Sequence, residues 1–301
     1  MECKVLLAEN QPEFGAGLEK ALTMEPADVV YAVRDSGIKG RGGAGFPTGV
    51  KWNLAGAASS DVKYVICNAD EGEPGTFKDR ILIEKYAERL LEGMAIGGYA
   101  IGAAFGIIYL RAEYPYLIPA IEKARKSLMD KGLLGENIRG KGFDFDVEIR
   151  PGAGAYVCGE ETSLIESLEG KRGEPRNKPP YPVNSGYLNK PTIVNNVETF
   201  CAVPHIVLNG PEWYMNLGAG ECSGTKLFSV SGDVERPGVY ELPMGAPLRD
   251  LLELAGATDV QAVQVGGASG RTVPASEIDR TLSFKDLPPG GSVIVFDSSV
   301  N

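Results

Sequence analysis

Apolar and polar positions alternate along the first two thirds of the chain in a pattern that predicts helices and strands in turn. Apolar residues recur at helical spacing in several segments, and we predict helices at 17–35, from Pro47 through Leu54, 79–104, 115–129 and 195–209. Short apolar runs bounded by turn residues predict buried strands at 62–68, 107–111 and 145–150. This order favours an α/β fold with a parallel, Rossmann-like sheet covered by helices on both faces.

The last part of the chain follows a different pattern. Apolar runs at 226–232 and 238–242 predict a hairpin around a turn. A short amphipathic helix at 248–255 and strands at 262–265 and 292–296 are predicted to follow. The order β-β-α-β-β indicates a small grasp-like sheet with one helix. The small polar residues around 218–225 mark a candidate boundary, so we expect domains at 1–222 and 223–301.

The longest uncharged stretch runs from Gly93 to Leu110 and reaches the length of a short membrane span. Its apolar residues are mostly Ala and Ile, and glycines interrupt it throughout. We therefore predict a closely packed, buried helix to about Ala104 and a strand from Ile107 rather than insertion into a membrane. The start of the sequence resembles neither a secretory nor a transit peptide, which favours a cytoplasmic location.

The composition narrows the classes of partner. Hydrophobic residues make up 43% of the chain and charged residues 23%, and the formal net charge is -10. These values are typical of a globular protein, and the acidic balance argues against nucleic acid or an anionic membrane as a partner. The basic residues Lys39, Arg41 and Lys51 are a local exception that suits a small anion.

The cysteines and the single histidine bear on whether this chain holds a metal or iron–sulfur site. The chain has five cysteines without a CxxC pair: Cys3, Cys67, Cys158, Cys201 and Cys222. An odd, scattered set favours a reducing compartment and packing roles, and argues against a metal or iron–sulfur cluster held by these residues alone. The only histidine, His205, lies in an apolar run and is expected to be a packing residue.

The densest chemical signal is the segment from Ser36 to Trp52, which holds six glycines and three cations. A basic, glycine-rich loop leading into a helix presents backbone N–H groups to an anion such as a nucleotide or flavin phosphate. An ordinary flexible turn is the alternative. Gly40-x-Gly42-x-x-Gly45 also matches the dinucleotide fingerprint, but it follows a predicted helix rather than a strand, so the match is weak.

An acidic loop follows the first predicted strand, at the edge of the sheet where open α/β proteins bind ligands. Asn68 and Asp70 could bond a polar heterocycle or a sugar. The loop's three carboxylates could instead bind a divalent cation, although the neighbouring Lys78 and Arg80 favour ion pairs at the loop end.

Two further groups stand where helices are predicted to begin. Small residues around Tyr156 would let the backbone approach a flat ligand, and Glu160 and Glu161 then suit either ligand contact or the first turn of a helix. The adjacent Asn195 and Asn196 either cap the following helix or donate to a phosphate.

These segments resemble, in this order, the flavin-carrying, NADH-binding subunit of respiratory complex I. The same module occurs in soluble NAD-reducing hydrogenases and NAD-dependent formate dehydrogenases. The resemblance is carried by residues 37–52, 67–80, 152–173, 178–182 and 191–199. Residues 230–255 are similar to that family's soluble-ligand-binding β-grasp domain.

The resemblance implies one non-covalent FMN, reduced by hydride transfer from NADH. The implied FMN-contacting positions are Gly40, Gly42, Lys51, Asn68, Asp70, Tyr156, Gly159, Glu160 and Asn196. The implied NADH-contacting positions are Gly43, Phe46, Glu73, Glu161, Lys178 and Tyr181. Arg41, Glu71 and Asn195 complete the expected cofactor-binding set. Glu161 is the expected catalytic residue, because a carboxylate beside the flavin ring lowers its reduction potential.

The family normally continues into a helical domain with a four-cysteine iron–sulfur cluster, which this sequence does not contain up to Asn301. Either the sequence is part of a longer chain or the protein lacks that domain. We therefore expect the electrons to pass to iron–sulfur partner subunits of a larger complex, which is cytoplasmic or peripheral on a membrane. The main alternative is a non-catalytic docking module. The complete set of loops favours the enzyme, and Glu73 favours NADH over NADPH.

Overall fold

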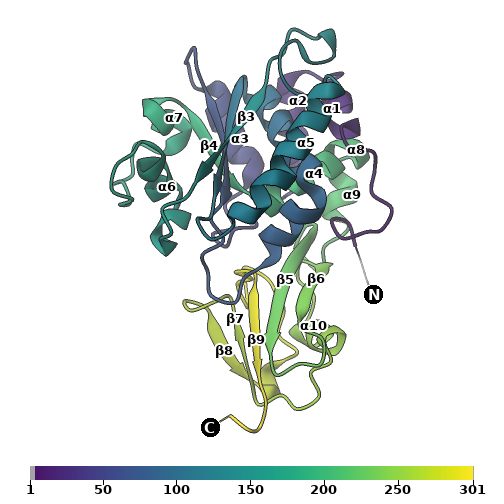
Figure 1. Ribbon diagram of the computed structural model, residues 1–301. Helices are drawn as coiled ribbons and strands as arrows, with labels where there is room; N and C mark the ends of the chain where they lie inside the picture. Colours follow the sequence, from purple (N-terminus) through teal and green to yellow (C-terminus); the bar gives the residue numbers. More distant parts are fainter. Residues whose placement is uncertain (1–3, 301) are drawn as a thin grey trace.

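A computed structural model describes residues 4–300, and Cys3 lies outside the described residues. The larger part is built on a four-stranded parallel sheet in the order β3-β2-β1-β4 (Figure 1). Its strands are β1 (Tyr64–Ala69), β2 (Phe105–Leu110), β3 (Asp146–Pro151) and β4 (Thr192–Asn196). Side chains of β1 alternate between the two faces, because Val65 and Cys67 join one apolar cluster whereas Ile66 joins another. The sheet is therefore buried on both faces, as the sequence predicts.

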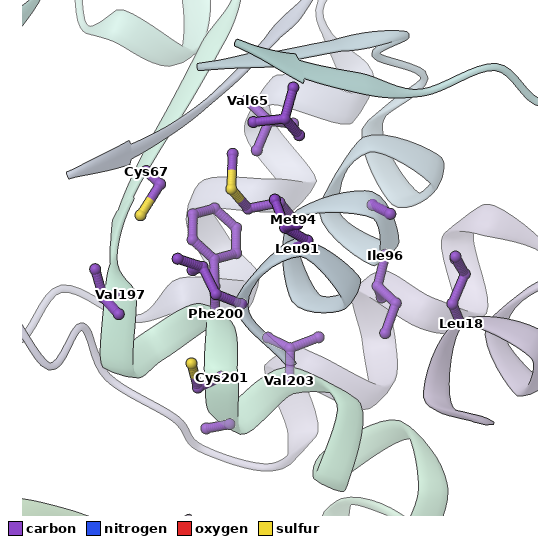
Figure 2. Close-up of a cluster of buried hydrophobic side chains, with 14 of the residues drawn as sticks. Leu18, Val65, Cys67, Leu91, Met94, Ile96, Val197, Phe200, Cys201 and Val203 are labelled. Carbon is purple, nitrogen blue, oxygen red and sulfur yellow. The ribbon is translucent and has the colours of Figure 1, made fainter. Parts of the chain in front are cut away.

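Most helices cover the face to which Val65 and Cys67 point. They are α1 (Ala16–Ala21), α2 (Pro26–Asp35), α3 (Thr48–Ala57), α4 (Lys78–Ile101), α5 (Ile118–Asp130), α8 (Val197–Asn209) and α9 (Pro211–Met215). Figure 2 shows Met94 of α4 and Phe200 of α8 packed beneath β1. The opposite face is covered by α6 (Glu161–Leu168), and α7 (Pro182–Ser185) lies beside β4.

The second sheet has five strands in the order β6-β5-β9-β7-β8 and lies beyond one end of the first sheet (Figure 1). Its elements are β5 (Thr225–Gly232), β6 (Gly238–Pro243), α10 (Leu248–Ala255), β7 (Ala262–Val265), β8 (Arg271–Pro274) and β9 (Ser292–Phe296). The parallel pairing of β5 with β9, the antiparallel hairpins β5–β6 and β7–β8 on either side and the single packed helix give a grasp-like sheet with its own apolar core.

Several predicted boundaries are wrong for identifiable reasons. The single helix expected at 17–35 is two helices, because Glu25 is extended before Pro26, which has no N–H and disfavours helical geometry in the residue before it. Residues 192–196 form β4, so α8 begins two residues later than the predicted helix. The short strand β8 has no counterpart in the prediction, although α10, β7 and β9 match it.

The remaining expectations about buried residues hold. Cys67, Cys158 and Cys201 are buried free thiols, and Cys222 is partly buried. His205 is 3% exposed, and burial lowers its pKa to about 3. Of the helices in residues 4–300, none combines the length and the hydropathy needed to cross a membrane.

Candidate functional site

The sheet changes direction between β1 and β4. From β1 the chain adds β2 and then β3 on one side, and β4 is placed last on the other side of β1. At such a switch point the loops leaving adjacent parallel strands diverge and leave a crevice outside the carboxyl ends. Asn68 and Asn196 are register partners near those ends, so the two asparagine-containing segments meet at the crevice.

A cleft of about 420 Å³ opens at this point, within the size range of ligand sites. Nine of the residues predicted from the sequence line it: Gly42, Asn68, Asp70, Glu71, Glu73, Tyr156, Gly159, Glu160 and Asn196. Seven residues that were not predicted line it as well: Gly72, Thr76, Lys78, Asp79, Val157, Pro175 and Gly290. The glycine loop, the acidic loop, the segment before α6 and the end of β4 are thus brought together.

The glycine loop is a narrow turn between α2 and α3. The Gly40 N–H donates to the Phe46 carbonyl at 2.9 Å and closes the turn. A Cβ on Gly42 would lie 3.2 Å from the Cβ of Asn196, so the loop backbone approaches the end of β4 closely. Gly43 has φ +122° and open space around it, a conformation that favours glycine.

Two predicted residues send their side chains away from the cleft. The Arg41 guanidinium is buried and donates to the Tyr214 hydroxyl at 3.1 Å and the Ser223 carbonyl at 2.9 Å. The Asn195 side chain accepts a hydrogen bond from the Trp52 indole at 2.9 Å. Both side chains therefore fix the scaffold around the site rather than line it.

Two carboxylates of the acidic loop differ in their hydrogen-bond partners. Asp70 has a buried oxygen, Oδ2, with no hydrogen-bond partner, and burial raises its pKa to about 6. Glu71 instead caps α4 by accepting from the Asp79 N–H at 2.7 Å, and burial together with the charge of Asp79 raises its pKa to about 7. Among residues 4–300, no three His, Cys, Asp or Glu side chains are grouped so that they could hold a metal ion.

Glu160 and Glu161 form an ion-pair cluster with Lys51 of α3 and with Lys178 of the loop before α7. Lys51 lies 3.0 Å from Glu161, and Lys178 lies 3.0 Å from Glu161 and 2.9 Å from Glu160. Burial opposes ionisation of Glu161, but Lys51 and Lys178 outweigh it and hold its pKa below the usual range. Glu160 also accepts from the Thr162 and Ser163 N–H groups, so the predicted capping of α6 and the contact with the cleft occur together.

Three aromatic rings of the predicted set are exposed. Phe46 is 49% exposed and has the Lys51 ammonium 5.9 Å from its ring centre, and Tyr181 is 53% exposed. Tyr156 is 61% exposed, and its hydroxyl donates to Glu73. Large rings open to solvent are suited to stacking on a flat ligand, and of these three Tyr156 lines the cleft.

The charged floor of the cleft was not predicted. Lys78 is 1% exposed, lies 2.7 Å from Asp79 and 2.8 Å from Glu198, and donates to the Asn196 amide oxygen at 3.2 Å. Burial opposes its charge, but the carboxylates around it raise its pKa. The sequence offers a usable signal here, a Lys-Asp pair at a helix start directly after an acidic loop. Gly290 arrives from the second sheet and has no such signal.

Two family models match different parts of the chain. The model of the Nuo51 FMN-binding domain matches residues 33–205, and that of the SLBB domain matches residues 227–272. The alpha subunit of the NAD-reducing hydrogenase HoxS from Cupriavidus necator is 51% identical over 282 residues, which are 93% of this chain and 47% of that protein.

Two other relatives carry different names. The NADP-reducing hydrogenase subunit HndC from Solidesulfovibrio fructosivorans is 50% identical over 92% of this chain and 58% of its own length. A subunit of the NADH-quinone oxidoreductase of Escherichia coli K12 is 47% identical over 92% of this chain and 64% of its own length. The chain thus spans roughly half to two thirds of these relatives.

A solved structure has the same fold. The crystal structure of an NAD⁺-reducing [NiFe]-hydrogenase in the H₂-reduced state superposes with a TM-score of 0.92 at 47% identity. The match covers 99% of this chain and 51% of the hydrogenase chain. Both sheets and their mutual arrangement therefore occur in a solved relative.

Proposed function

This chain belongs to the Nuo51 FMN-binding domain family, and from that premise we propose that it is an FMN-dependent NADH dehydrogenase module. The observation that carries the proposal is the cleft at the switch point between β1 and β4, where four separate loops converge. Its electrons would pass to iron–sulfur clusters in other parts of a larger complex. The names of the relatives, which are subunits of hydrogenases and of NADH-quinone oxidoreductase, support that arrangement.

The chemistry of the cleft fits FMN. Asp70 Oδ2 and Thr76 Oγ1 are buried in its lining without hydrogen-bond partners, as expected for groups that a polar ligand completes. Lys78 brings a positive charge to the floor. The residues that would hold the cofactor are Gly40, Gly42, Lys51, Asn68, Asp70, Thr76, Lys78, Tyr156, Gly159, Glu160 and Asn196. When bound, FMN supplies a two-electron acceptor for the hydride of NADH.

The chain's own residues would orient the nucleotide and set the local charge. Phe46 and Tyr181 offer exposed faces on which the nucleotide rings can stack. Lys178 bridges Glu160 and Glu161 and brings a positive charge to the side of the cleft. Glu161, kept ionised by Lys51 and Lys178, would disfavour additional negative charge on the cofactor and so lower its reduction potential.

We propose NADH rather than NADPH as the reductant, because Glu73 at the cleft would repel a 2′-phosphate. The choice needs a test, since relatives of similar identity are named NAD-reducing and NADP-reducing. We further propose the domain division at residue 222, and a location in the cytoplasm, free or peripheral on a membrane complex.

The test is an absorption spectrum of the purified chain reconstituted with FMN, taken before and after anaerobic addition of NADH. Bleaching of the bound flavin band by NADH is the expected result. A folded chain that binds no FMN would contradict the proposal and favour the non-catalytic docking module. FMN binding without bleaching by either NADH or NADPH would retain the cofactor and contradict the dehydrogenase activity.

A further inference from the structure

A lysine of the second sheet reaches the backbone of the glycine loop. Lys226 lies on β5 with 1% of its side chain exposed, and its ammonium group donates to the Arg41 carbonyl at 3.0 Å. The same ammonium group lies 3.3 Å from the Glu198 carboxylate. A buried ammonium group makes a strong, charge-assisted hydrogen bond to a carbonyl. The direction of the Arg41 carbonyl is therefore fixed from the second sheet.

The rest of Arg41 is held as well. Its N–H donates to the Thr199 hydroxyl at 2.9 Å, on the other side of the Cα atom. Its guanidinium donates to the Tyr214 hydroxyl and the Ser223 carbonyl. Because the N–H and the side chain are anchored separately, the hydrogen bond from Lys226 serves to orient the one group that remains, the peptide that follows Arg41.

That peptide carries a free donor at the cleft. The bond between Arg41 and Gly42 is trans, and in a planar trans peptide the N–H points opposite to the carbonyl. The Gly42 N–H therefore points away from Lys226. Gly42 lines the cleft, and among the groups of residues 4–300 none accepts from its N–H. Backbone donors that a ligand covers need a partner in that ligand.

We propose that Lys226 positions the peptide between Arg41 and Gly42 so that the Gly42 N–H donates a hydrogen bond to the FMN; this inference rests on the proposed function. Without the ammonium group, the Arg41 carbonyl would lack its donor and would gain by turning towards water in the cleft. Gly42 has no side chain to resist that rotation. An oxygen would then face the cofactor in place of the N–H. Lys226 is a positioning residue, since it acts through this peptide.

The donor itself is testable in the unsubstituted chain by amide hydrogen exchange, measured by NMR. Gly42 is exposed and its N–H is unpaired, so its amide proton should exchange rapidly without FMN and slowly with saturating FMN. The Gly40 amide, which donates to the Phe46 carbonyl, is the internal control and should be protected in both states. Equal exchange of the Gly42 amide with and without FMN would overturn the inference.

The positioning role is tested with Lys226→Met, which removes the ammonium group and keeps an apolar side chain in the same space. Glu198 retains Lys78 at 2.8 Å and the N–H of Leu227, so its charge remains compensated. We expect the dissociation constant of FMN, measured by flavin fluorescence, to rise about three- to tenfold, the size of one hydrogen bond to a ligand. An unchanged dissociation constant would overturn the inference.

Amide exchange in the same variant separates a misdirected peptide from a damaged loop. With FMN at saturation, the Gly42 amide of Lys226→Met should exchange faster than that of the unsubstituted chain. The Gly40 amide should stay protected, because the turn that it closes does not involve Lys226. Loss of protection at both amides would show that Lys226 supports the whole loop, and would overturn the inference.

Thr225→Val is the matched control on the neighbouring residue of β5. It removes a hydroxyl that donates to Glu241 at 2.6 Å and leaves the contact with the glycine loop in place. The dissociation constant of FMN should not change, and a rise equal to that of Lys226→Met would overturn the inference. If FMN binds but neither NADH nor NADPH bleaches it, only the proposed function fails, and these measurements still decide the inference. If the folded chain binds no FMN, both fail.

Discussion

At the scale of single residues, the burial of Asp70 in the cleft lowers the stability of the folded chain. Its Oδ2 atom is buried without a partner, and burial raises its pKa to about 6. The pKa of the Asp70 carboxyl is near 4 in the unfolded chain and near 6 in the folded chain. Between these pH values the unfolded chain therefore loses the proton first. Stability from this group is therefore complete below about pH 4 and is lost as the pH rises through 6.

Asp70→Asn should for this reason stabilise the FMN-free protein at pH 8 by about 1 kcal/mol, a value reduced for the partial exposure of the group. The gain should fade as the pH is lowered from 6 towards 4, while affinity for FMN falls. Urea unfolding of both proteins at pH 5 and pH 8 measures it. Asp130→Asn, at an exposed position, is the control. A gain of the same size at both pH values would contradict the burial of a charge as its cause.

Replacing Glu161 should change the reduction potential of the bound cofactor. Glu161→Gln removes one negative charge from the pair of lysines at 3.0 Å, which leaves the cleft more positive and favours the reduced flavin. We expect the FMN midpoint potential to rise by roughly 20–60 mV, about 1–3 kcal/mol for a two-electron couple. Spectroelectrochemical titration measures the shift. Glu174→Gln, which removes an equal charge from a largely exposed side chain, should leave the potential unchanged. No shift in Glu161→Gln would exclude its role in tuning.

At the scale of elements, the first sheet packs against the crossing of α4 and α8. A Cβ on Gly93 of α4 would lie 2.0 Å from the carbonyl oxygen of Phe200, so the two helices touch through backbone. Gly93→Ala should lower the free energy of unfolding by about 3 kcal/mol or more, because neither helix can yield without moving β1.

Gly56→Ala in α3 is the matched control for this prediction. Its Cβ would meet only ordinary contacts at 3.8 Å, so the better helix propensity of alanine should raise stability by about 0.5 kcal/mol. Chemical denaturation of both variants gives the two values. Similar stability of Gly93→Ala and the unsubstituted chain would mean that the helices cross with more space than the structure shows.

A helix or strand could be predicted from the sequence where its residues favour one structure, and not where they suit two. The isolated amphipathic helix at 248–255 and the apolar strand at 292–296 match α10 and β9. The strand β4 was missed because Asn195 and Asn196 favour a helix cap, and Asn196 does cap α8 while also ending the strand. Whether such a residue continues a strand is decided by pairing with β1, a contact distant in the sequence.

The candidate site shows the same limit. The loops that meet at the cleft could be predicted, because each follows a strand or precedes a helix at one edge of the sheet. Side-chain direction could not, since Arg41 turns inward to Tyr214, a residue far along the chain. The contribution of Gly290 depends on how the second sheet is docked, which no local pattern specifies.

At the scale of the whole molecule, Glu198 joins the two sheets. It lies in the first turn of α8 with 1% of its side chain exposed, 2.8 Å from Lys78 and 3.3 Å from Lys226 of β5. It also accepts the N–H of Leu227 at 2.8 Å. The same carboxylate therefore neutralises the lysine on the floor of the cleft and holds the first strand of the second sheet.

Glu198→Gln should lower the free energy of unfolding by about 3 kcal/mol, because it leaves two buried lysines short of negative charge. Lys226→Met should change the free energy of unfolding by about 1 kcal/mol or less. Burial lowers the pKa of Lys226 to about 8, so the unfolded chain retains this proton to higher pH and stability rises from pH 8 towards 10. That rise should be absent in Lys226→Met.

Urea unfolding at pH 8 and 10, with limited proteolysis of residues 218–224 between the sheets, tests both substitutions. If the Glu198 carboxylate holds the two sheets together, its loss should expose residues 218–224 to protease. Lys226→Met should leave these residues protected. Equal protection in Glu198→Gln would show that the other contacts between the two sheets, such as the Phe77–Ser229 hydrogen bond, are enough to hold them. The buried charges would then serve the floor of the cleft only.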